Sequence, residues 1–432
     1  MEKMFKLHRI CLLLVLPVSA MGAEKQTPEV DPTLAPRLPL NELRIFAEAF
    51  NRVSAAYVEE IDDRALLDSA IKGMLSQLDP HSAYLDRKSF TDLQETTTGN
   101  YGGLGLEVGQ EDGVVKVISP MDDTPADNAG LMPGDLILQL DDTPVRGMSL
   151  SDAVESMRGE PGSTIKLLVL KKGESVPRDI TITRKIIKVA SVRQRFLEEG
   201  YGYLRIAQFQ SGTGSEVKKA IDELKEEGNL TGLVIDLRNN PGGVLQSAVD
   251  VSDFFVSEGL IVYTSGRIRN TDVRFIASTP DSLEGVPIVV LVNEGTASAS
   301  EIVAGALQDH GRAVIMGTHT FGKGSVQTIL PLNDEKAIKL TTALYYTPNG
   351  RSIQAEGITP DIRVDRSTVT RLDKNPWGAT EKNLLNHLDG DDENANSETQ
   401  SNVELASQDY QLNEALTLLK GLNVLNRNQP QG

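Results

Sequence analysis

The second half of the chain alternates short apolar strands with helices, and this alternation most constrains the fold. From about Val189, strand-like runs such as Leu233–Leu237 and Ile288–Val292 are followed by segments of helical periodicity such as Ser298–Gln308. That order predicts a partly parallel sheet covered by helices. We therefore expect a mixed-sheet core over residues 189–370 in a multidomain α/β (α+β) chain.

Two regions of different character precede this core. Residues 99–188 contain short β-rich runs separated by Gly, Pro and Asp turns, with one amphipathic helix expected at Ser149–Arg158. This pattern predicts a small, self-contained β-rich domain. Between positions 40 and 77, apolar residues recur every three or four positions, which predicts two helices in an N-terminal helical region over residues 40–98.

The N-terminus has the layout of a secretory signal peptide. Three basic residues precede the apolar run Ile10–Leu16, and small residues lead to a cleavage site after Ala20. The run is too short to span a bilayer, although an N-terminal anchor that stays uncut is the alternative. We expect residues 1–20 to be removed and the protein to be exported to the periplasm of a bacterial cell envelope.

Cysteine content and charge limit the chemistry of the protein. Cys11 is the only cysteine and lies in the signal, so no disulfide can form within the chain. There are 61 acidic and 43 basic residues, a net charge of −18 that signal cleavage would change to −20. This acidity argues against binding to nucleic acid or anionic lipid, which require clustered Lys and Arg. The spacing of the histidines offers no metal-binding pair on one helix face, so we expect no metal or other cofactor.

Two polar segments flank the expected domains. Residues 21–39 hold four prolines and predict a disordered lead-in. Residues 371–432 form an acidic, low-complexity tail, and the composition of residues 389–409 provides little apolar surface to bury. The tail ends in the amphipathic stretch Tyr410–Leu425. Its apolar face needs a surface to pack on, either the protein's own core or another subunit.

Ser298 is the first candidate for chemistry. It lies where the strand Ile288–Val292 ends and a helix begins. A serine in such a turn stands clear of the sheet, and the helix N-terminus offers free backbone N–H groups to a developing oxyanion. The string Ser298-Ala299-Ser300-Glu301 is also a capping box, in which the serine only closes the helix. The local sequence leaves both interpretations open.

Lys323 is the candidate base. Two glycines flank it, and Gln327 follows four residues later, on the same face of an extended strand. Burial would lower the pKa of the lysine toward ~7–8, so that the neutral amine can accept a proton and the Gln327 amide can orient it. A solvated surface lysine is the alternative. His310 is expected ~18 Å from Ser298 along the helix, whereas His319, in a loop, remains a second candidate base.

Residues 317–323 also match the opening of a phosphate-binding P-loop, and they follow the strand Ala313–Met316. However, position 324 is Gly where that motif requires Ser or Thr. The continuation Ser325–Leu330 is β-like, so no helix N-terminus would face a phosphate. These two departures disfavour a nucleotide site.

A pair of glycines ends the third constellation, Asp236–Gly243. Gly242 and Gly243 can adopt positive φ and let backbone N–H groups approach a ligand closely, as an oxyanion pocket requires. The same string would also serve as a tight strand-to-helix turn.

Taken together, these strings resemble the carboxyl-terminal processing proteases, also called tail-specific proteases, a serine-lysine peptidase family. The resemblance covers roughly residues 40–361 and rests on six motifs in a fixed order. They are Asp79–Ser82, Gly102–Gly105, Asp236–Gly243, Thr296–Glu301, Phe321–Gln327 and Thr347–Arg351.

The resemblance implies a role for each candidate residue. Ser298 would be the nucleophile, Lys323 its base and Gln327 the residue that positions the lysine. The backbone N–H groups of Gly242 and Ala299 would be the oxyanion donors. The implied reaction is acyl transfer to serine followed by hydrolysis, without a cofactor.

The resemblance also identifies residues 99–188 as a PDZ domain, which binds an extended peptide as an added strand and holds its terminal carboxylate in backbone N–H groups. The loop in that position is Gly103, Leu104, Gly105 and Leu106. The implied function is cleavage of proteins near apolar C-terminal tails, with the PDZ domain gating activity. A non-catalytic PDZ scaffold or chaperone with a peptidase-like fold is the alternative.

Partners also follow from the resemblance. Enzymes of peptidoglycan remodelling are expected substrates, and a lipoprotein adaptor is an expected partner. We expect a homo-oligomer with contacts through residues 40–78 and 410–425.

Overall fold

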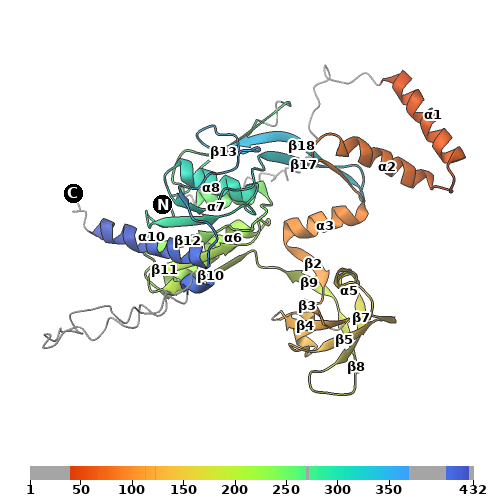
Figure 1. The fold of residues 1–432 in the computed structure, drawn as a ribbon, viewed down its shortest axis with the longest axis horizontal. Helices are drawn as coiled ribbons and strands as arrows, with labels where there is room; N and C mark the ends of the chain where they lie inside the picture. The colour runs from red at the N-terminus through yellow and green to blue at the C-terminus, as the bar shows by residue number, and fades with distance from the viewer. Residues whose placement is uncertain (1–38, 112, 122, 269–271, 369–404, 428–432) are drawn as a thin grey trace, which may run out of the picture. The chain divides into compact units, whose positions relative to one another are not determined.

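The computed structural model describes residues 39–111, 113–121, 123–268, 272–368 and 405–427 (Figure 1). The expected signal peptide, almost all of the lead-in and the first half of the acidic tail lie outside these residues. The chain divides into two units after Asp68. The first unit contains α1 (Leu40–Ala56) and the start of α2 (Asp63–Ser76), the two helices that the periodicity predicts. No residue of α1 is buried.

The second unit begins with a short strand and a helix that lead into the β-rich domain. They are β1 (Ala83–Leu85) and α3 (Arg87–Thr98). Asp86 caps α3 by accepting a hydrogen bond from the Ser89 N–H at 3.0 Å. Gly99 ends the helix in the left-handed conformation, with φ of 71°.

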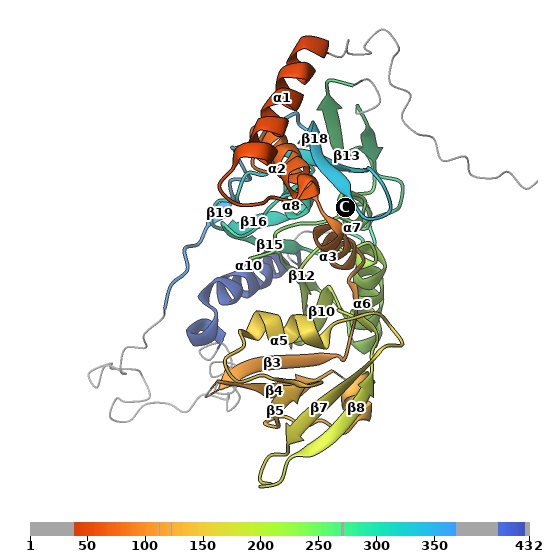
Figure 2. The same cartoon turned by 90° about the vertical axis from the view of Figure 1, so that its right-hand side faces the viewer.

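The β-rich domain folds around a core of its own, which includes Val117, Ile137 and Leu167. Its strands pair in the order β3-β4-β5-β7-β8, with β6 on β5, and Figure 2 shows helix α5 beside this sheet. Strands β2 and β9 pair where the chain enters and leaves the domain. The bounds are β2 (Asn100–Gly103), β3 (Leu106–Glu111), β4 (Val114–Pro120), α4 (Pro125–Asn128), β5 (Leu136–Leu140), β6 (Thr143–Pro144), α5 (Leu150–Met157), β7 (Thr164–Leu170), β8 (Arg178–Thr183) and β9 (Lys185–Lys188).

The remaining residues form the predicted α/β core around a six-stranded sheet. Its order is β10-β11-β12-β15-β16-β19; β10 is antiparallel to β11, and the later neighbours run parallel. The mixed-sheet prediction is thereby confirmed. The strands are β10 (Val192–Glu198), β11 (Tyr201–Ile206), β12 (Gly232–Asp236), β15 (Ile288–Val292), β16 (Val314–Gly317) and β19 (Ile362–Arg363).

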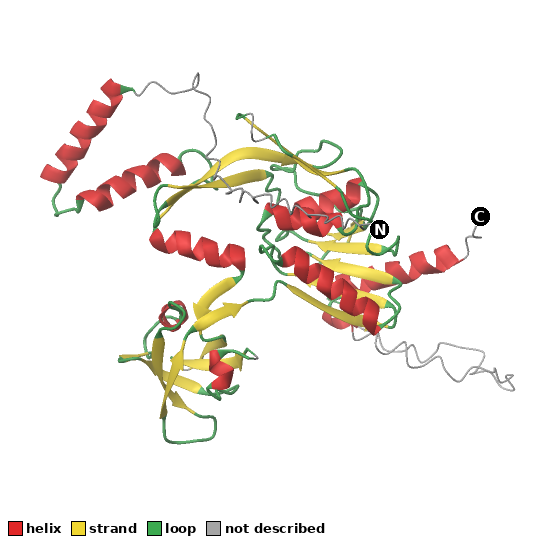
Figure 3. Ribbon diagram, turned by 180° about the vertical axis from the view of Figure 1, so that it is seen from behind, coloured by secondary structure: helices red, strands yellow, loops and turns green. Residues whose placement is uncertain are grey.

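Helices cover both faces of this sheet, as Figure 3 shows. Side chains of a strand alternate between its faces. Leu233 and Ile235 of β12 belong to the core under α6, α7 and α8, whereas Val234 belongs to a second cluster with Leu419 of α10. The C-terminal amphipathic helix therefore packs on the protein's own core, one of the two predicted alternatives. The helices are α6 (Thr213–Glu227), α7 (Leu245–Asp253), α8 (Ala299–Asp309) and α10 (Tyr410–Arg427).

A second sheet, which the sequence pattern did not predict, lies beside the core helices α7 and α8. Its order is β1-β18-β13-β14, and β17 also pairs with β18. The strands are β13 (Leu260–Gly266), β14 (Arg274–Ile276), β17 (Ser325–Pro331) and β18 (Ala337–Tyr346). Across the described residues, no helix combines the length and hydrophobicity needed to span a bilayer.

Candidate active site

Ser298 occupies a sharp turn between β15 and α8. Its backbone has φ of 58° and ψ of −117°, a conformation that a residue with a side chain adopts only where its surroundings enforce it. Ser298 is the N-cap residue of α8, and its N–H donates to Oε2 of Glu301 at 2.8 Å. The side chain also lines a cleft of about 910 Å³. The capping and the nucleophilic interpretations are therefore compatible.

Glu301 holds the nucleophile turn and the lysine loop together. Its side chain is fully buried. Oε2 accepts from the N–H groups of Ser298 and Lys323 at 2.8 and 2.9 Å, and Oε1 accepts from the Thr320 hydroxyl and the Gly322 N–H at 2.5 and 2.7 Å. The sequence indicated only a helix cap at this position. The capping-box pattern was the available signal, and it carried no information about the loop that begins 19 residues later.

Lys323 lies in the loop before β17 and lines the same cleft as Ser298. Burial lowers the pKa of Lys323 and the positive charge of Lys339 lowers it further, whereas Glu301 raises it. A lowered pKa increases the fraction of the amine that is neutral at a given pH, and the neutral amine is the form that accepts a proton. In this conformation no hydrogen bond between Lys323 Nζ and Ser298 is found within the described ranges.

Gln327 also lines the cleft, but the hydrogen bonds of its amide in the described residues go to other groups than the lysine. Its Nε2 donates to the backbone and side-chain oxygens of Ser325, at 3.2 and 2.9 Å. Nearby on β18, Thr341 ties the strand to the Asp79–Ser82 motif. Its hydroxyl donates to Asp79 at 3.1 Å, and its N–H donates to the Ser82 hydroxyl at 3.1 Å. That motif therefore supports the strand beside the cleft, a role that its sequence did not indicate.

The two expected oxyanion donors differ in availability. The Ala299 N–H, at the start of α8, has no hydrogen-bond partner in the described part of the chain. The Gly242 N–H instead donates to Oδ1 of Asn240 at 2.9 Å. A Cβ on Gly242 would lie 2.7 Å from the Ser298 Cβ, so only glycine permits this approach. Gly242 is thus beside the nucleophile, with its N–H engaged in this conformation.

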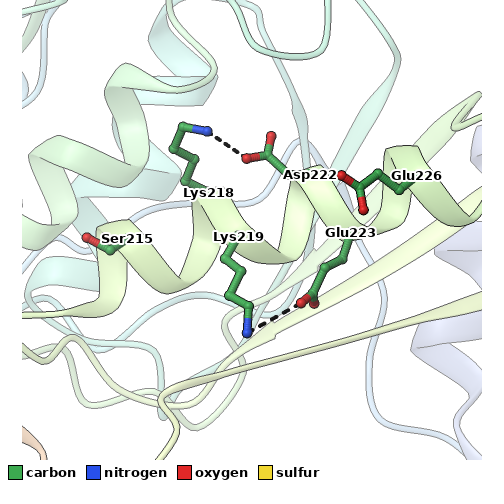
Figure 4. A pocket seen from close by; sticks show the side chains of 6 residues that line it. All are labelled: Ser215, Lys218, Lys219, Asp222, Glu223 and Glu226. Carbon is green, nitrogen blue, oxygen red and sulfur yellow. Dashed lines mark hydrogen bonds and ion pairs between the residues drawn. The ribbon is translucent and has the colours of Figure 1, made fainter.

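The cleft has apolar walls. Phe90 and Leu93 of α3 line it together with Leu245 of α7 and Ile302 of α8. A second hollow, of about 440 Å³, lies along the outer face of α6 (Figure 4). There Lys218 pairs with Asp222 at 2.6 Å, an ion pair between neighbouring turns of a solvated helix. Of these two hollows, the first is the one that combines apolar walls with candidate catalytic groups.

The structure provides no support for the nucleotide interpretation. The backbone N–H groups of Gly322 and Lys323, which would cradle a phosphate in a P-loop, donate to the buried Glu301 carboxylate. The loop continues into strand β17 rather than into a helix. In the described residues, no three side chains of types that bind metals gather in one place.

The three histidines in the described part of the chain, His81, His310 and His319, lie outside the cleft lining. His310 hydrogen-bonds to the Leu260 carbonyl at 2.7 Å, and His319 Nδ1 lies 2.9 Å from the Thr320 carbonyl oxygen. Burial and the positive charge of Lys323 lower the pKa of His81. These placements leave Lys323 as the base candidate inside the cleft.

The expected carboxylate loop of the β-rich domain precedes an edge strand. Gly105 has φ of 76°, and the Leu104 carbonyl accepts from the Ala126 N–H at 2.9 Å, which fixes the loop over α4. Leu106 begins β3, which stands at the end of its sheet and pairs with β4. Gly103 closes β2. An edge strand that follows a glycine loop is the arrangement that peptide addition requires.

Comparison with known proteins agrees with this arrangement. Residues 200–364 match the model of peptidase family S41, residues 102–182 match the PDZ domain, and residues 18–89 match the N-terminal domain of the activating protease CtpB. A carboxy-terminal-processing protease of Bartonella bacilliformis is 46% identical over 385 residues, 88% of each chain. The carboxyl-terminal-processing protease of Synechocystis is 39% identical over 70% of this chain and 72% of its own.

Among solved structures, the photosystem II D1 C-terminal processing protease is 34% identical over 75% of this chain and 93% of its own, with a TM-score of 0.45. The sequence matches extend over most of the chain and include both the peptidase core and the β-rich domain. The chain therefore belongs to the carboxy-terminal processing proteases, serine peptidases of family S41 that carry a PDZ domain.

Proposed function

We propose that this protein is an exported endopeptidase that cleaves proteins near their C-termini through a dyad of Ser298 and Lys323. The observation that carries the proposal is the shared cleft: a serine in a strained turn and a lysine of lowered pKa line the same apolar cavity. Strained backbone and perturbed pKa values are concentrated at catalytic sites.

In the proposed mechanism, neutral Lys323 removes the Ser298 hydroxyl proton as Oγ attacks the peptide carbonyl carbon. The carbonyl oxygen becomes an oxyanion, which the Ala299 N–H stabilises. The Gly242 N–H would stabilise it as well after exchanging its hydrogen bond to Asn240 Oδ1 for one to the oxyanion. Lys323 then protonates the leaving amine, and a water activated by the same amine hydrolyses the acyl-enzyme. Gln327 would orient Lys323 after its amide turns away from Ser325.

We further propose that the PDZ domain selects the substrate tail. An apolar C-terminus would add to β3, and its carboxylate would bind the backbone of the loop over residues 103–106. Because the loop is neutral, this selection is compatible with the acidic net charge of the chain. Periplasmic enzymes of peptidoglycan remodelling fit this substrate class, and a lipoprotein adaptor is a proposed partner.

Self-association through residues 40–78 and 410–425 is part of the same proposal. Apolar side chains of α1 support the first contact, since Ile45 and Phe46 are 65% and 48% exposed. Val424 and Leu425, at the end of α10, are 60% and 65% exposed and support the second. Light scattering on chains truncated at either end would test both contacts.

The catalytic proposal is tested by cleavage of an unstructured protein with an apolar C-terminus. Ser298→Ala and Lys323→Ala should each lower the cleavage rate by roughly a thousandfold or more, since members of a catalytic set act as a unit. Ser215→Ala and Lys218→Ala, on the outer face of α6, are matched controls that should cleave at the wild-type rate. Equal cleavage by all five proteins would refute the dyad.

A further inference from the structure

Arg238 lies just after β12, in the turn that leads to Gly242. Its guanidinium binds two carboxylates from distant parts of the chain. Nε and Nη2 donate to the two oxygens of Asp236 at 3.0 and 2.7 Å, and Nη1 and Nη2 donate to the two oxygens of Asp409 at 2.9 and 2.7 Å. Nη1 also donates to Gln411 Oε1 at 3.1 Å. The arginine therefore joins the start of α10 to the end of β12, two elements that pack side by side (Figure 1).

Both carboxylates are fixed by further bonds. Asp409 precedes α10 and caps it, because its Oδ1 accepts from the Leu412 N–H at 3.1 Å. Asp236 is buried, and its Oδ2 accepts from the Tyr203 hydroxyl at 2.9 Å. Burial alone would raise the pKa of Asp409, but its hydrogen bonds with Arg238 and the positive charge of that side chain hold the pKa below its usual value. The pair is therefore charged at neutral pH.

The backbone on either side of Arg238 is bonded to the loop that leads to the nucleophile. Asn239 has φ of 54°, and its N–H donates to Asn293 Oδ1 at 2.8 Å. Asn293 Nδ2 donates back to Asn239 Oδ1 at 2.9 Å. On the other side, the Leu237 carbonyl accepts from the Thr296 hydroxyl at 2.8 Å. A shift of Arg238 would therefore be passed to this loop.

A second set of bonds reaches the turn of Ser298 itself. The Asn240 carbonyl accepts from the Ala297 N–H at 2.9 Å and from the Ser300 hydroxyl at 3.1 Å, one residue before and two residues after the nucleophile. Gly242, beside Ser298, follows in the same turn. The position of this turn therefore sets how the nucleophile and the glycine face one another.

We propose that Arg238 is a positioning residue for the catalytic turn, and that its ion pair with Asp409 makes the docking of α10 a requirement for full activity. The inference rests on the proposed function of Ser298. Arg238 and Asp409 do not line the cleft, so they act on the reaction through the backbone of the turn. An ion pair with a structural role alone would change stability and leave the rate of the chemical step as it is.

Asp409→Asn tests the role, because it removes the charge and keeps the helix cap, for which asparagine is as good as aspartate. The matched control is Asp281→Asn. Asp281 accepts from Arg312 at 2.9 and 3.3 Å, in another partly buried pair that does not line the cleft. Three quantities are measured on the full chain: kcat and KM on an unstructured protein with an apolar C-terminus, the rate constant for acylation of Ser298 by a fluorophosphonate, and the midpoint of thermal unfolding.

We expect Asp409→Asn to lower kcat and the fluorophosphonate rate constant by the same factor, roughly threefold to tenfold, because small misplacements of reacting groups are costly in rate. KM should change by less than about twofold, since the altered side chain does not line the cleft. Both variants should unfold at a lower temperature than the wild-type protein. Asp281→Asn should nevertheless keep the wild-type rate constants.

Arg238→Lys is a second variant, which decides the question if Asp409→Asn does not fold. Lysine keeps a positive charge beside Asp236 but cannot make paired hydrogen bonds to two carboxylates. It should lower both rate constants at least as much as Asp409→Asn. Wild-type rate constants in either folded variant would overturn the inference, and so would an equal loss in Asp281→Asn, which would trace the effect to stability. Failure of the wild-type protein to react more than Ser298→Ala would instead overturn the proposed dyad.

Discussion

Replacing Glu301 by glutamine should destabilise the peptidase core by an amount that can be worked out from its four hydrogen bonds. Each carboxylate oxygen accepts from two donors: Ser298 and Lys323 on Oε2, and Thr320 and Gly322 on Oε1. A glutamine has one oxygen and one NH₂ group. Whichever way the amide turns, its NH₂ group faces two donors.

The less costly orientation places the NH₂ group toward the Thr320 hydroxyl, which can rotate and accept. The Gly322 N–H is then buried without a partner, at a cost of about 1–3 kcal/mol. The two remaining bonds, to the N–H groups of Ser298 and Lys323, lose their charged acceptor, at about 1 kcal/mol each. Relief from burying a charge offsets part of this loss. We therefore expect a net destabilisation of about 2–4 kcal/mol for Glu301→Gln.

Thermal unfolding followed by circular dichroism measures this effect. For a core of this size, about 2–4 kcal/mol corresponds to a decrease of roughly 4–16 °C in the midpoint. The matched control is Glu294→Gln, an exposed glutamate that accepts one side-chain bond, from the Thr318 hydroxyl at 2.9 Å. This control should change stability by less than about 0.5 kcal/mol.

Glu301→Gln has a second expected effect, on pH dependence. The negative charge of Glu301 raises the pKa of Lys323, so its removal lowers that pKa. The base is active when neutral, and the rising limb of the pH–rate profile should therefore move toward lower pH. The role assigned to this carboxylate would be refuted if both variants unfolded within 1 °C of the wild-type protein and the rising limb of the Glu301→Gln profile did not move.

Two further predictions concern Lys339 and α10. Lys339→Gln removes a positive charge that lowers the pKa of Lys323, so the rising limb of the pH–rate profile should move toward higher pH. Lys218→Gln, on the outer face of α6, should leave this limb in place. Cleavage rates measured across pH at constant ionic strength test this, and an unmoved limb for Lys339→Gln would contradict it. Leu419→Ala leaves a cavity at a fully buried position between α10 and the sheet, and it should lower the free energy of unfolding by about 2–5 kcal/mol. The control is Leu425→Ala, which changes a side chain that is 65% exposed and should lower it by less than about 0.5 kcal/mol. Equal unfolding midpoints in urea for the two leucine variants would contradict the packing of this helix on the sheet.

The central sheet could be predicted because its signal is local. Strands β12 and β15 are buried along their whole length, so each is a continuous apolar run that stands out from its neighbours. The helices between them show the 3.6-residue period. The second sheet carries no such signal. Strand β18 mixes polar and apolar residues, and its partner β1 lies more than 250 residues earlier in the chain, with Ala83 opposite Lys339.

The candidate site divides in a similar way. Ser298 was predictable because a strand, a turn and a helix follow one another around it, and Lys323 because glycines flank it. The contacts of Gln327 and Gly242 could not be predicted, because each depends on the acceptor that a neighbouring residue presents. The Gln327 amide donates to Ser325, and the Gly242 N–H donates to Asn240. Tyr345, whose hydroxyl donates to the Lys323 carbonyl oxygen, had no sequence signal, because strand pairing alone brings β18 to this loop.

The strained turn at Ser298 indicates why these buried polar contacts matter. A non-glycine residue at φ of 58° costs of order 1–3 kcal/mol and persists only where neighbouring contacts enforce it. Glu301 holds the turn from the helix side, and the Ala297 N–H, which donates to the Asn240 carbonyl at 2.9 Å, holds it from the glycine turn. Neither contact belongs to a strand ladder or to the repeating bonds of a helix. Because loops held by a few side chains open at lower free energy than packed sheets, the active geometry should be lost before the central sheet unfolds.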